Sequence, residues 1–324
     1  MQINNQILLE SETRQDYVGD TEAEYAESRC CCCKVAYFTI GGFIFLGHWR
    51  RRLTVPIILS ILYLLSFVVF IFDTYGTYPN LYSASLAYFF TGFFFICVIF
   101  SYLLVIIKGP GYVPYNWAKT RQRHYTWEES MKSMALYADQ AEFARSTLDR
   151  PKRSCFSNEA RRFVLRADHF CIWAKSWIGL KNHRFFALLC IYSFLYSLSI
   201  LGFRYWMYKD IITGVSKFKY FYILGIVTVV VLGYFGSLSL FHFIKTIRNL
   251  ARNVTTLEEW GGRLNEWNRG CCNNFEEVCG SRKYAICWPF PCVWCLEPLE
   301  DGFYDEDHND RSLISEAFQN SPPE

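Results

Sequence analysis

Four long segments of the chain are apolar and almost free of charged residues. They are Leu53–Phe72, Leu86–Ile107, Phe185–Phe203 and Tyr220–Phe243. Each has about the 20 residues that a helix needs to cross ~30 Å of hydrocarbon. In lipid a spanning segment must satisfy its own backbone hydrogen bonds, so β-branched and aromatic content does not argue against helix here. The pattern predicts an all-α integral membrane protein with four transmembrane helices, rather than a soluble domain with long buried helices.

The charges between these segments predict an orientation. Arg50–Arg52 precede the first segment, the loop Lys108–Arg184 is rich in Lys and Arg, and the loop Asp73–Ser85 contains neither. Further cations follow the fourth segment at Lys245, Arg248 and Arg252. Because positively charged flanks stay in the cytosol, both termini and the long central loop are expected there. The third loop opposes this orientation, with Arg204, Lys209, Lys217 and Lys219 on the predicted outer side.

Composition narrows the possible functions. The 324 residues carry a formal net charge of only +3, so no nucleic-acid partner is expected. Residues 1–29 are polar and acidic, which is the opposite of a signal-peptide start, so the first apolar segment should itself act as the targeting signal. Most of the 14 cysteines fall in segments predicted to be cytosolic, where stable disulfides are rare. We expect residence in the endoplasmic reticulum or Golgi rather than the plasma membrane.

These patterns predict seven consecutive parts. They are residues 1–29, a disordered acidic tail; 30–52, a Cys-rich interfacial segment; 53–107, helices 1 and 2; 108–184, a cytosolic domain; 185–243, helices 3 and 4; 244–299, a cytosolic C-terminal region; and 300–324, a disordered tail. Within the cytosolic domain, Trp127–Arg145 has helical character. Ser154–Trp177 shows no period, so the domain should be compact but largely irregular.

The candidate chemistry lies in Asp168-His169-Phe170-Cys171, inside the central loop. A thiol beside an imidazole and a carboxylate, close to a membrane, is suited to attack a membrane-soluble acyl group. A histidine fits the role of base because its ordinary pKa lies near neutral.

The residues around this stretch resemble the cysteine-rich domain of the DHHC protein S-acyltransferases. The matching residues, in order, are Arg150-Pro151-x-Arg153, Val164, Asp168-His169-x-Cys171-x-Trp173, Gly179, Asn182 and Phe185-Phe186. Three further stretches are similar to the family's DPG, TTxE and Asn-containing motifs. They are Gly109-Pro110-Gly111-x-x-Pro114, Thr255-Thr256-Leu257-Glu258 and Gly270-x-x-x-Asn274-x-x-x-Val278-x-Gly280. With the four-helix topology, the resemblance extends from Leu53 to Gly280.

The resemblance implies a protein-cysteine S-acyltransferase, or palmitoyltransferase, with a catalytic domain at residues 108–184. Cys171 would carry the acyl group from a long-chain acyl-CoA to cytosolic cysteines of membrane or peripheral proteins. His169 would accept the thiol proton and Asp168 would orient His169. Trp173 would lie near the acyl chain, and the site would be supported by Thr255, Thr256, Glu258 and Asn274. No tightly bound cofactor is expected. The alternatives are a catalytically inactive membrane scaffold or regulator and, less compatible with spans that hold few ionisable residues, a transporter.

The chain departs from the family at the zinc ligands that the resemblance implies. Those positions hold Phe156, Ser157, Ala160, Phe163, Phe170 and Trp177. Hydrocarbon side chains cannot coordinate zinc, and no Cys-x-x-Cys precedes Arg150. We therefore predict that zinc is absent and that a small cluster formed by the three Phe and the Trp replaces it.

The remaining cysteines allow two interpretations each. Cys30–Cys33, beside a basic and apolar segment, are candidates for S-acylation or simple surface thiols. Cys292-x-x-Cys295 could bind a metal, although acylated or free thiols near the membrane fit the sequence better. His242 lies within the fourth apolar segment, where a contact at the helix end is favoured over a proton relay.

Overall fold

The computed structural model describes residues 24–30, 33–40, 43–46, 54–77, 81–112, 152–157, 162–212, 221–264, 266–291 and 296–299. Several predictions fall outside these ranges. They concern most of the two acidic tails, the helical character of Trp127–Arg145, the position of Ala160 and the pair Cys292 and Cys295.

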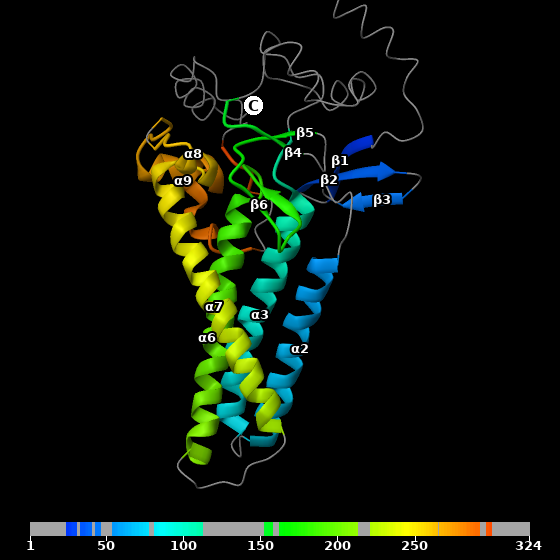
Figure 1. Ribbon diagram of the computed structural model, residues 1–324, viewed down its shortest axis with the longest axis vertical. Helices are drawn as coiled ribbons and strands as arrows, with labels where there is room; N and C mark the ends of the chain where they lie inside the picture. The colour runs from blue at the N-terminus through cyan, green and yellow to red at the C-terminus, as the bar shows by residue number, and fades with distance from the viewer. Residues whose placement is uncertain are drawn as a thin grey trace, which may run out of the picture.

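Four long helices run side by side through the molecule (Figure 1). They are α2 (Thr54–Thr77), α3 (Leu81–Lys108), α6 (His183–Ile212) and α7 (Phe221–Arg252). All four are long and apolar enough to cross a membrane, which confirms the predicted set of spanning helices. The predicted and observed helix ends differ most at α6 and α7, each of which continues about nine residues beyond its predicted end. The prediction ended each helix at the first charged residues, but the helices continue through them.

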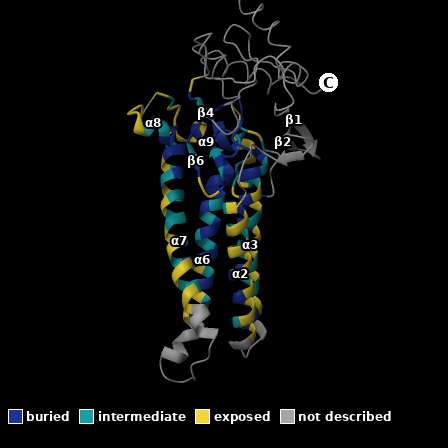
Figure 2. Ribbon diagram, turned by 45° about the vertical axis from the view of Figure 1, so that its right-hand side comes forward, coloured by how far each residue is buried: buried dark blue, intermediate teal, exposed yellow. Residues whose placement is uncertain are grey.

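Helix α6 lies at the centre of the bundle, while α2 and α7 face outward. In the apolar stretch of α6 56% of the residues are buried, against 17% in α2 and 11% in α7. Figure 2 shows the exposed positions along the outer sides of the helices. Outward apolar side chains such as Phe72 and Tyr234 would be a liability in water but are solvated by lipid.

Polar contacts connect α2 to α6 inside the bundle. The Tyr63 hydroxyl donates to Ser193 Oγ over 3.0 Å, and an ion pair of 2.7 Å joins Arg204 to Asp73. Arg204 is one of the four cations that opposed the predicted orientation. Its charge is neutralised within the bundle, so it no longer counts as an unpaired loop cation.

Two short β-hairpins lie at one end of the bundle, which we call the hairpin end (Figure 1). Strand β4 (Cys155–Ser157) pairs with β5 (Arg162–Val164), and β6 (His169–Cys171) pairs with β7 (Ser176–Ile178), both antiparallel. The prediction of an all-α chain is therefore wrong for this region, while the largely irregular character expected of the central domain stays a prediction outside these four strands. Strands of three residues are too short to show an alternating period in the sequence.

A further sheet precedes the first helix. Strands β1 (Glu24–Cys30), β2 (Cys33–Ile40) and β3 (Phe43–Leu46) form an antiparallel sheet in that order. Part of the predicted acidic tail and the predicted interfacial segment are thus strands, in keeping with the β-branched and aromatic residues Tyr37-Phe38-Thr39-Ile40. Among the described residues the chain is still mostly helical.

Aromatic pairs occupy four of the positions at which the family resemblance implied zinc ligands. Phe156 faces Phe163 across one hairpin with ring centroids 5.3 Å apart, and Phe170 faces Trp177 across the other at 6.0 Å. The predicted single cluster is therefore wrong, because β4–β5 and β6–β7 are separate sheets and each holds its own pair. These hydrocarbon rings pack edge to face and do not fit a zinc ion.

A buried cluster of charges links the hairpins to the segments after α7. Arg153 makes two hydrogen bonds to Glu258, of 2.7 and 2.9 Å, and a third of 3.1 Å to Glu277. Arg166 bonds Glu277 at 3.0 Å and Asn253 at 2.9 Å. All five side chains are buried. We call Arg153, Arg166, Asn253, Glu258 and Glu277 the charge cluster.

The cluster joins the hairpin region to three pieces of chain that follow one another about a hundred residues later. Glu258 lies on α8 (Thr256–Trp260) and Glu277 on α9 (Cys271–Cys279), and Asn253 lies at the end of α7. Beyond α9 follows the 3₁₀ helix η2 (Arg282–Cys287). The two carboxylates match the two guanidinium groups, so the buried charges are paired and hydrogen-bonded.

Removing one member of the charge cluster should destabilise the protein strongly. Arg153→Ala leaves Glu258 buried without its bidentate partner, which costs about 3–5 kcal/mol. The matched control is Arg282→Ala, because Arg282 pairs with Glu276 at 3.1 Å but is half-exposed, so its loss costs less than about 1 kcal/mol. Chemical unfolding in detergent compares the two, and equal losses would contradict the assigned importance of the cluster.

The aromatic pairs predict a protein whose stability does not depend on metal. Purified protein should contain no stoichiometric zinc by elemental analysis, and a strong chelator should leave its melting temperature unchanged. Phe163→Ala, by contrast, should cost about 3–5 kcal/mol because it empties a buried ring position. A chelator-induced fall in melting temperature would show that a metal carries part of the fold.

Candidate active site

Asn182 helps to hold the β6–β7 hairpin against α3. Asn182 donates from Nδ2 to the Val105 carbonyl at 3.0 Å and to the Trp177 carbonyl at 2.9 Å, while its Oδ1 accepts from the Gly179 amide at 2.9 Å. A Cβ at Gly179 would lie only 2.6 Å from the Pro110 carbonyl oxygen. Glycine at this position therefore allows the close approach that brings the hairpin to the helix end.

Asp168, His169 and Cys171 come together at this hairpin. The Nδ1 atom of His169 donates to Asp168 Oδ2 over 2.6 Å, since a carboxylate only accepts. Asp168 accepts two more hydrogen bonds from Thr256, from its amide at 2.8 Å and from its hydroxyl at 3.1 Å. With Nδ1 held by Asp168, the other ring nitrogen, Nε2, is the one available to Cys171, whose thiol contributes to the raised pKa of His169.

The electrostatics of this trio raise the basicity of the imidazole. Burial by itself lowers the pKa of His169, but the hydrogen bond to Asp168 and then the hydrogen bond to Cys171 outweigh it and raise that pKa to about 9. Burial by itself raises the pKa of Asp168, but the charges of His183 and His169 and the Thr256 hydrogen bond keep it well below its usual range. Asp168 is thus ionised at neutral pH.

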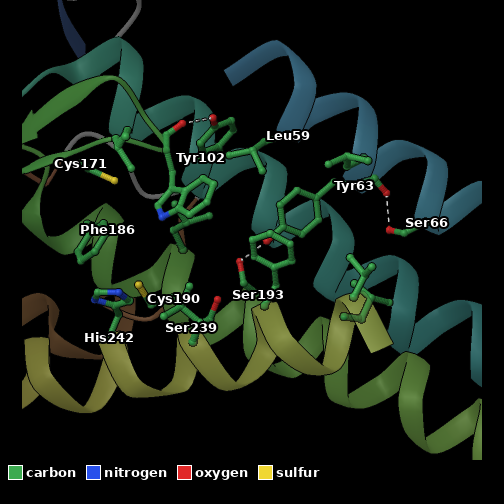
Figure 3. A pocket seen from close by; sticks show the side chains of 18 of the residues that line it. Leu59, Tyr63, Ser66, Tyr102, Cys171, Phe186, Cys190, Ser193, Ser239 and His242 are labelled. Carbon is green, nitrogen blue, oxygen red and sulfur yellow. Dashed lines mark hydrogen bonds between the residues drawn. The ribbon is translucent and has the colours of Figure 1, made fainter. Parts of the chain in front are cut away.

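An apolar cavity of about 390 Å³ opens beside Cys171 and runs down between the helices. Figure 3 shows Cys171, Phe186 and Cys190 at one end, with Tyr63 and Ser66 farther down the bundle. Its wall on α7 extends from His242 to Val227, ~22 Å at 1.5 Å per residue. One leaflet of a bilayer accounts for about half of the ~30 Å hydrocarbon core, or ~15 Å, so a wall of ~22 Å is long enough for one acyl chain.

Trp173 lies on the wall of this cavity, where the sequence analysis expected it. Its ring packs edge to face on Phe235 of α7 at 5.9 Å, and its backbone carbonyl accepts a 2.8 Å hydrogen bond from the Tyr102 hydroxyl of α3. Trp173 therefore links the hairpin to both helices that border the cavity. Its contact with an acyl chain stays a prediction.

The four predicted support residues take different positions. Thr256 bonds Asp168 directly, whereas Thr255 caps α8 in a capping box with Glu258, and Glu258 belongs to the charge cluster. Asn274 donates to the Ala251 carbonyl and to Asn268 Oδ1, each at 2.8 Å. Its partners place it at the junction between the end of α7 and α9, away from the trio. Asn274 therefore positions the chain around Thr256 only indirectly.

Several residues that build the site had no signal in the sequence. Arg166, Asn253 and Glu277 were assigned no role, because a buried charge looks like a surface charge when only sequence is available. Arg153 was noted as part of a motif, which was the one available hint. His242 was expected near the end of its helix, but α7 continues to Arg252 and His242 lies on the cavity wall.

The arrangement is suited to thiol chemistry on an apolar acyl group. Cys171 and His169 both line the cavity, the pKa of His169 is raised to about 9, and Asp168 orients its imidazole. The described residues hold no grouping of three or more His, Cys, Asp or Glu side chains that could bind a metal ion. The prediction that zinc is absent remains to be tested by metal analysis.

Comparison with known proteins agrees with this geometry. Residues 139–263 match the family model of the DHHC palmitoyltransferases. One relative, the probable protein S-acyltransferase 13 of Arabidopsis thaliana, is 27% identical over 59% of this chain and 67% of its own length. Another, protein S-acyltransferase 8 of the same plant, is 25% identical over 74% of this chain and 66% of its own length. A third, probable protein S-acyltransferase 1 from the same plant, is 31% identical over 40% of each chain.

The chain spans about two thirds of the length of the first two relatives. The matched family region includes both hairpins, the trio Asp168, His169 and Cys171, and the helices α6 and α7 that border the cavity. On these grounds residues 139–263 are assigned to the DHHC palmitoyltransferase family model, within a chain whose four long helices are apolar enough to cross a membrane.

Proposed function

We propose that this protein is an active protein-cysteine S-acyltransferase that carries a long-chain acyl group as a thioester on Cys171. The observation that carries the proposal is the position of Cys171, which together with His169 lines an apolar cavity long enough for an acyl chain. Long-chain acyl-CoA is the donor, and cysteines of membrane or peripheral proteins are the acceptors.

In the first step His169 takes the thiol proton of Cys171. The hydrogen bond to Asp168 favours the protonated imidazole and raises the pKa of His169 to about 9, so His169 can hold the proton that Cys171 releases. The Cys171 sulfur then attacks the carbonyl carbon of the acyl-CoA thioester, and the bond from that carbon to the CoA sulfur breaks. The CoA thiolate leaves and takes the proton back from His169, so acyl-enzyme and free CoA thiol form.

In the second step a substrate cysteine repeats the reaction in the reverse sense. Its thiol gives a proton to His169 while its sulfur attacks the Cys171 thioester, and the Cys171 thiolate leaves and recovers that proton. Asp168 keeps the same imidazole tautomer through both steps because Thr256 holds the carboxylate from a separate helix, α8. A displacement of about 1 Å at such a site can cost ~100-fold in rate.

We further propose that the hairpin end faces the cytosol. Lys245 lies in the last turns of α7 at that end, the basic residues Arg50–Arg52 precede α2 in the sequence, and acyl-CoA and reduced substrate thiols are both available in the cytosol. The central loop 108–184 is then the catalytic domain, both termini are cytosolic, and the membrane is that of the endoplasmic reticulum or Golgi.

The second candidate is an inactive relative that scaffolds or regulates other membrane proteins. The observation in its favour is the replacement of metal-ligand positions by aromatic pairs, such as Phe170 with Trp177 directly beside the trio. Against it, the hydrogen bonds between Asp168, His169 and Thr256 form a complete orienting set, which a protein without chemistry has no need to keep.

Labelling with a long-chain acyl-CoA separates these two functions. Purified protein in which Cys30–Cys33 are replaced by Ser should acquire one hydroxylamine-sensitive acyl group, and Cys171→Ala should abolish it. Cys190→Ala is the matched control, because Cys190 lines the same cavity from α6 but does not belong to the trio of Asp168, His169 and Cys171, and its label should persist. Undiminished labelling of the Cys171→Ala variant would establish the inactive scaffold instead.

The pairing of His169 with Asp168 predicts a pH-dependent stability. The folded-state pKa of His169, about 9, lies above the ordinary value of 6.5, so its stabilising effect is complete below pH 6.5 and disappears as the pH rises to 9. The free energy of unfolding should fall over this window by at most about 3 kcal/mol. In His169→Gln this fall should be absent or much smaller, as followed by thermal unfolding in detergent at several pH values. Parallel profiles for the two proteins would refute the assigned pairing.

A further inference from the structure

The segment after α9 exposes large apolar side chains. Tyr284, Ile286 and Phe290 are 47%, 82% and 44% exposed, and all three lie within ten residues of one another. Trp288, between them, stacks on Phe275 of α9 with ring centroids 6.5 Å apart. One side of the segment is therefore packed on the protein, and the other presents an apolar surface that needs a partner.

One hydrogen bond fixes the depth of this segment relative to the bundle. The hydroxyl of Tyr192 donates to the Pro289 carbonyl over 2.7 Å. Tyr192 lies nine residues past His183, the first residue of α6, which is ~13 Å along the helix axis. Helical side chains tilt toward the N-terminus, so the hydroxyl lies somewhat nearer the hairpin end than its own Cα. Pro289 thus lies beside the spanning helices, at about the ~5–10 Å depth of an interfacial segment.

The residues before and after this segment both lie at the hairpin end of the bundle. It comes from α9 at the hairpin end, and Figure 1 shows the segment in orange below α8 and α9, alongside the long helices. Glu297 then pairs with Lys108, the last residue of α3, at 2.8 Å. Between Arg282 and Glu297 the chain therefore descends beside the helices and is back at their hairpin end.

The backbone of the segment suits an apolar environment. The amides of Tyr284, Trp288 and Phe290 donate to carbonyls three residues earlier, over 3.0–3.1 Å. Pro289 and Pro291 have no N–H to satisfy, and the Pro289 carbonyl is the one that Tyr192 binds. Because these backbone groups are satisfied and the segment packs on α6 and α9, its polar groups do not oppose a position at the membrane interface.

We propose that Arg282–Pro291 is a re-entrant segment that inserts Tyr284, Ile286 and Phe290 into the lipid leaflet at the hairpin end. Arg282 and Lys283, both exposed, lie where the segment leaves the surface and reach the phosphate groups of the lipids. The stack of Trp288 on Phe275 connects this insertion to α9, and α9 carries Glu277 of the charge cluster. The lipid contact is separate from acyl transfer and does not depend on it.

Photo-crosslinking tests the identity of the partner. The photoreactive residue p-benzoylphenylalanine replaces Ile286 in the full chain, which is reconstituted into phosphatidylcholine liposomes that contain an alkyne-tagged lipid. Phe241, 63% exposed on the spanning helix α7, is the positive control, and Leu264, 45% exposed in the turn after α8, is the matched control outside the bundle. Each variant is used only if it elutes from a sizing column like the wild type, and Tyr284 and Phe290 serve as replicate positions.

The expected result is tagged lipid on the Ile286 and Phe241 variants, with at least about tenfold less on the Leu264 variant. A crosslinked dimer at Ile286 would assign the surface to a second copy of the chain and overturn the proposal. Lipid on the Phe241 variant without lipid on the Ile286 variant would also overturn it. So would equal labelling of the Ile286 and Leu264 variants, because the label would then report exposure and not insertion.

Discussion

The structure depends on a buried match between two arginines and two glutamates. Arg153 and Arg166 come from the hairpin region, and Glu258 and Glu277 come from two helices that follow the last spanning helix. Each ion would be costly to bury alone, so the cluster holds only when all four are in place. It therefore makes the position of the hairpins conditional on the correct docking of α8 and α9.

The docking of α8 also determines the position of the residues proposed to be catalytic. Glu258 and Thr256 lie on the same short helix, α8, so the carboxylate that pairs with Arg153 also fixes the residue that holds Asp168. Asp168 in turn orients His169 toward Cys171. A chain of direct contacts thus leads from the charge cluster to the reactive thiol. It offers a physical reason why the site can be ordered where the usual zinc ligands are replaced by aromatic rings.

The long helices could be predicted from the sequence, and so could the proximity of Asp168, His169 and Cys171. Twenty apolar residues have few alternatives in a membrane, and Asp168-His169-x-Cys171 carries its chemistry in three side chains. The hairpins were missed because strands such as His169–Cys171 are too short to alternate visibly. The charge cluster was missed because the burial of Arg166 depends on Glu277, more than a hundred residues away. The aromatic replacements were predicted as one cluster, but strand pairing divides them into two.

The central claim is that packed aromatic pairs and the charge cluster keep Cys171 reactive without metal. The most direct measurement combines elemental analysis with peptide mass spectrometry on one chelator-treated sample after incubation with long-chain acyl-CoA. The account predicts a thioester-linked acyl group on the peptide that contains Cys171 while zinc is far below one equivalent. An acyl group that forms on Cys171 only after zinc is restored would contradict it.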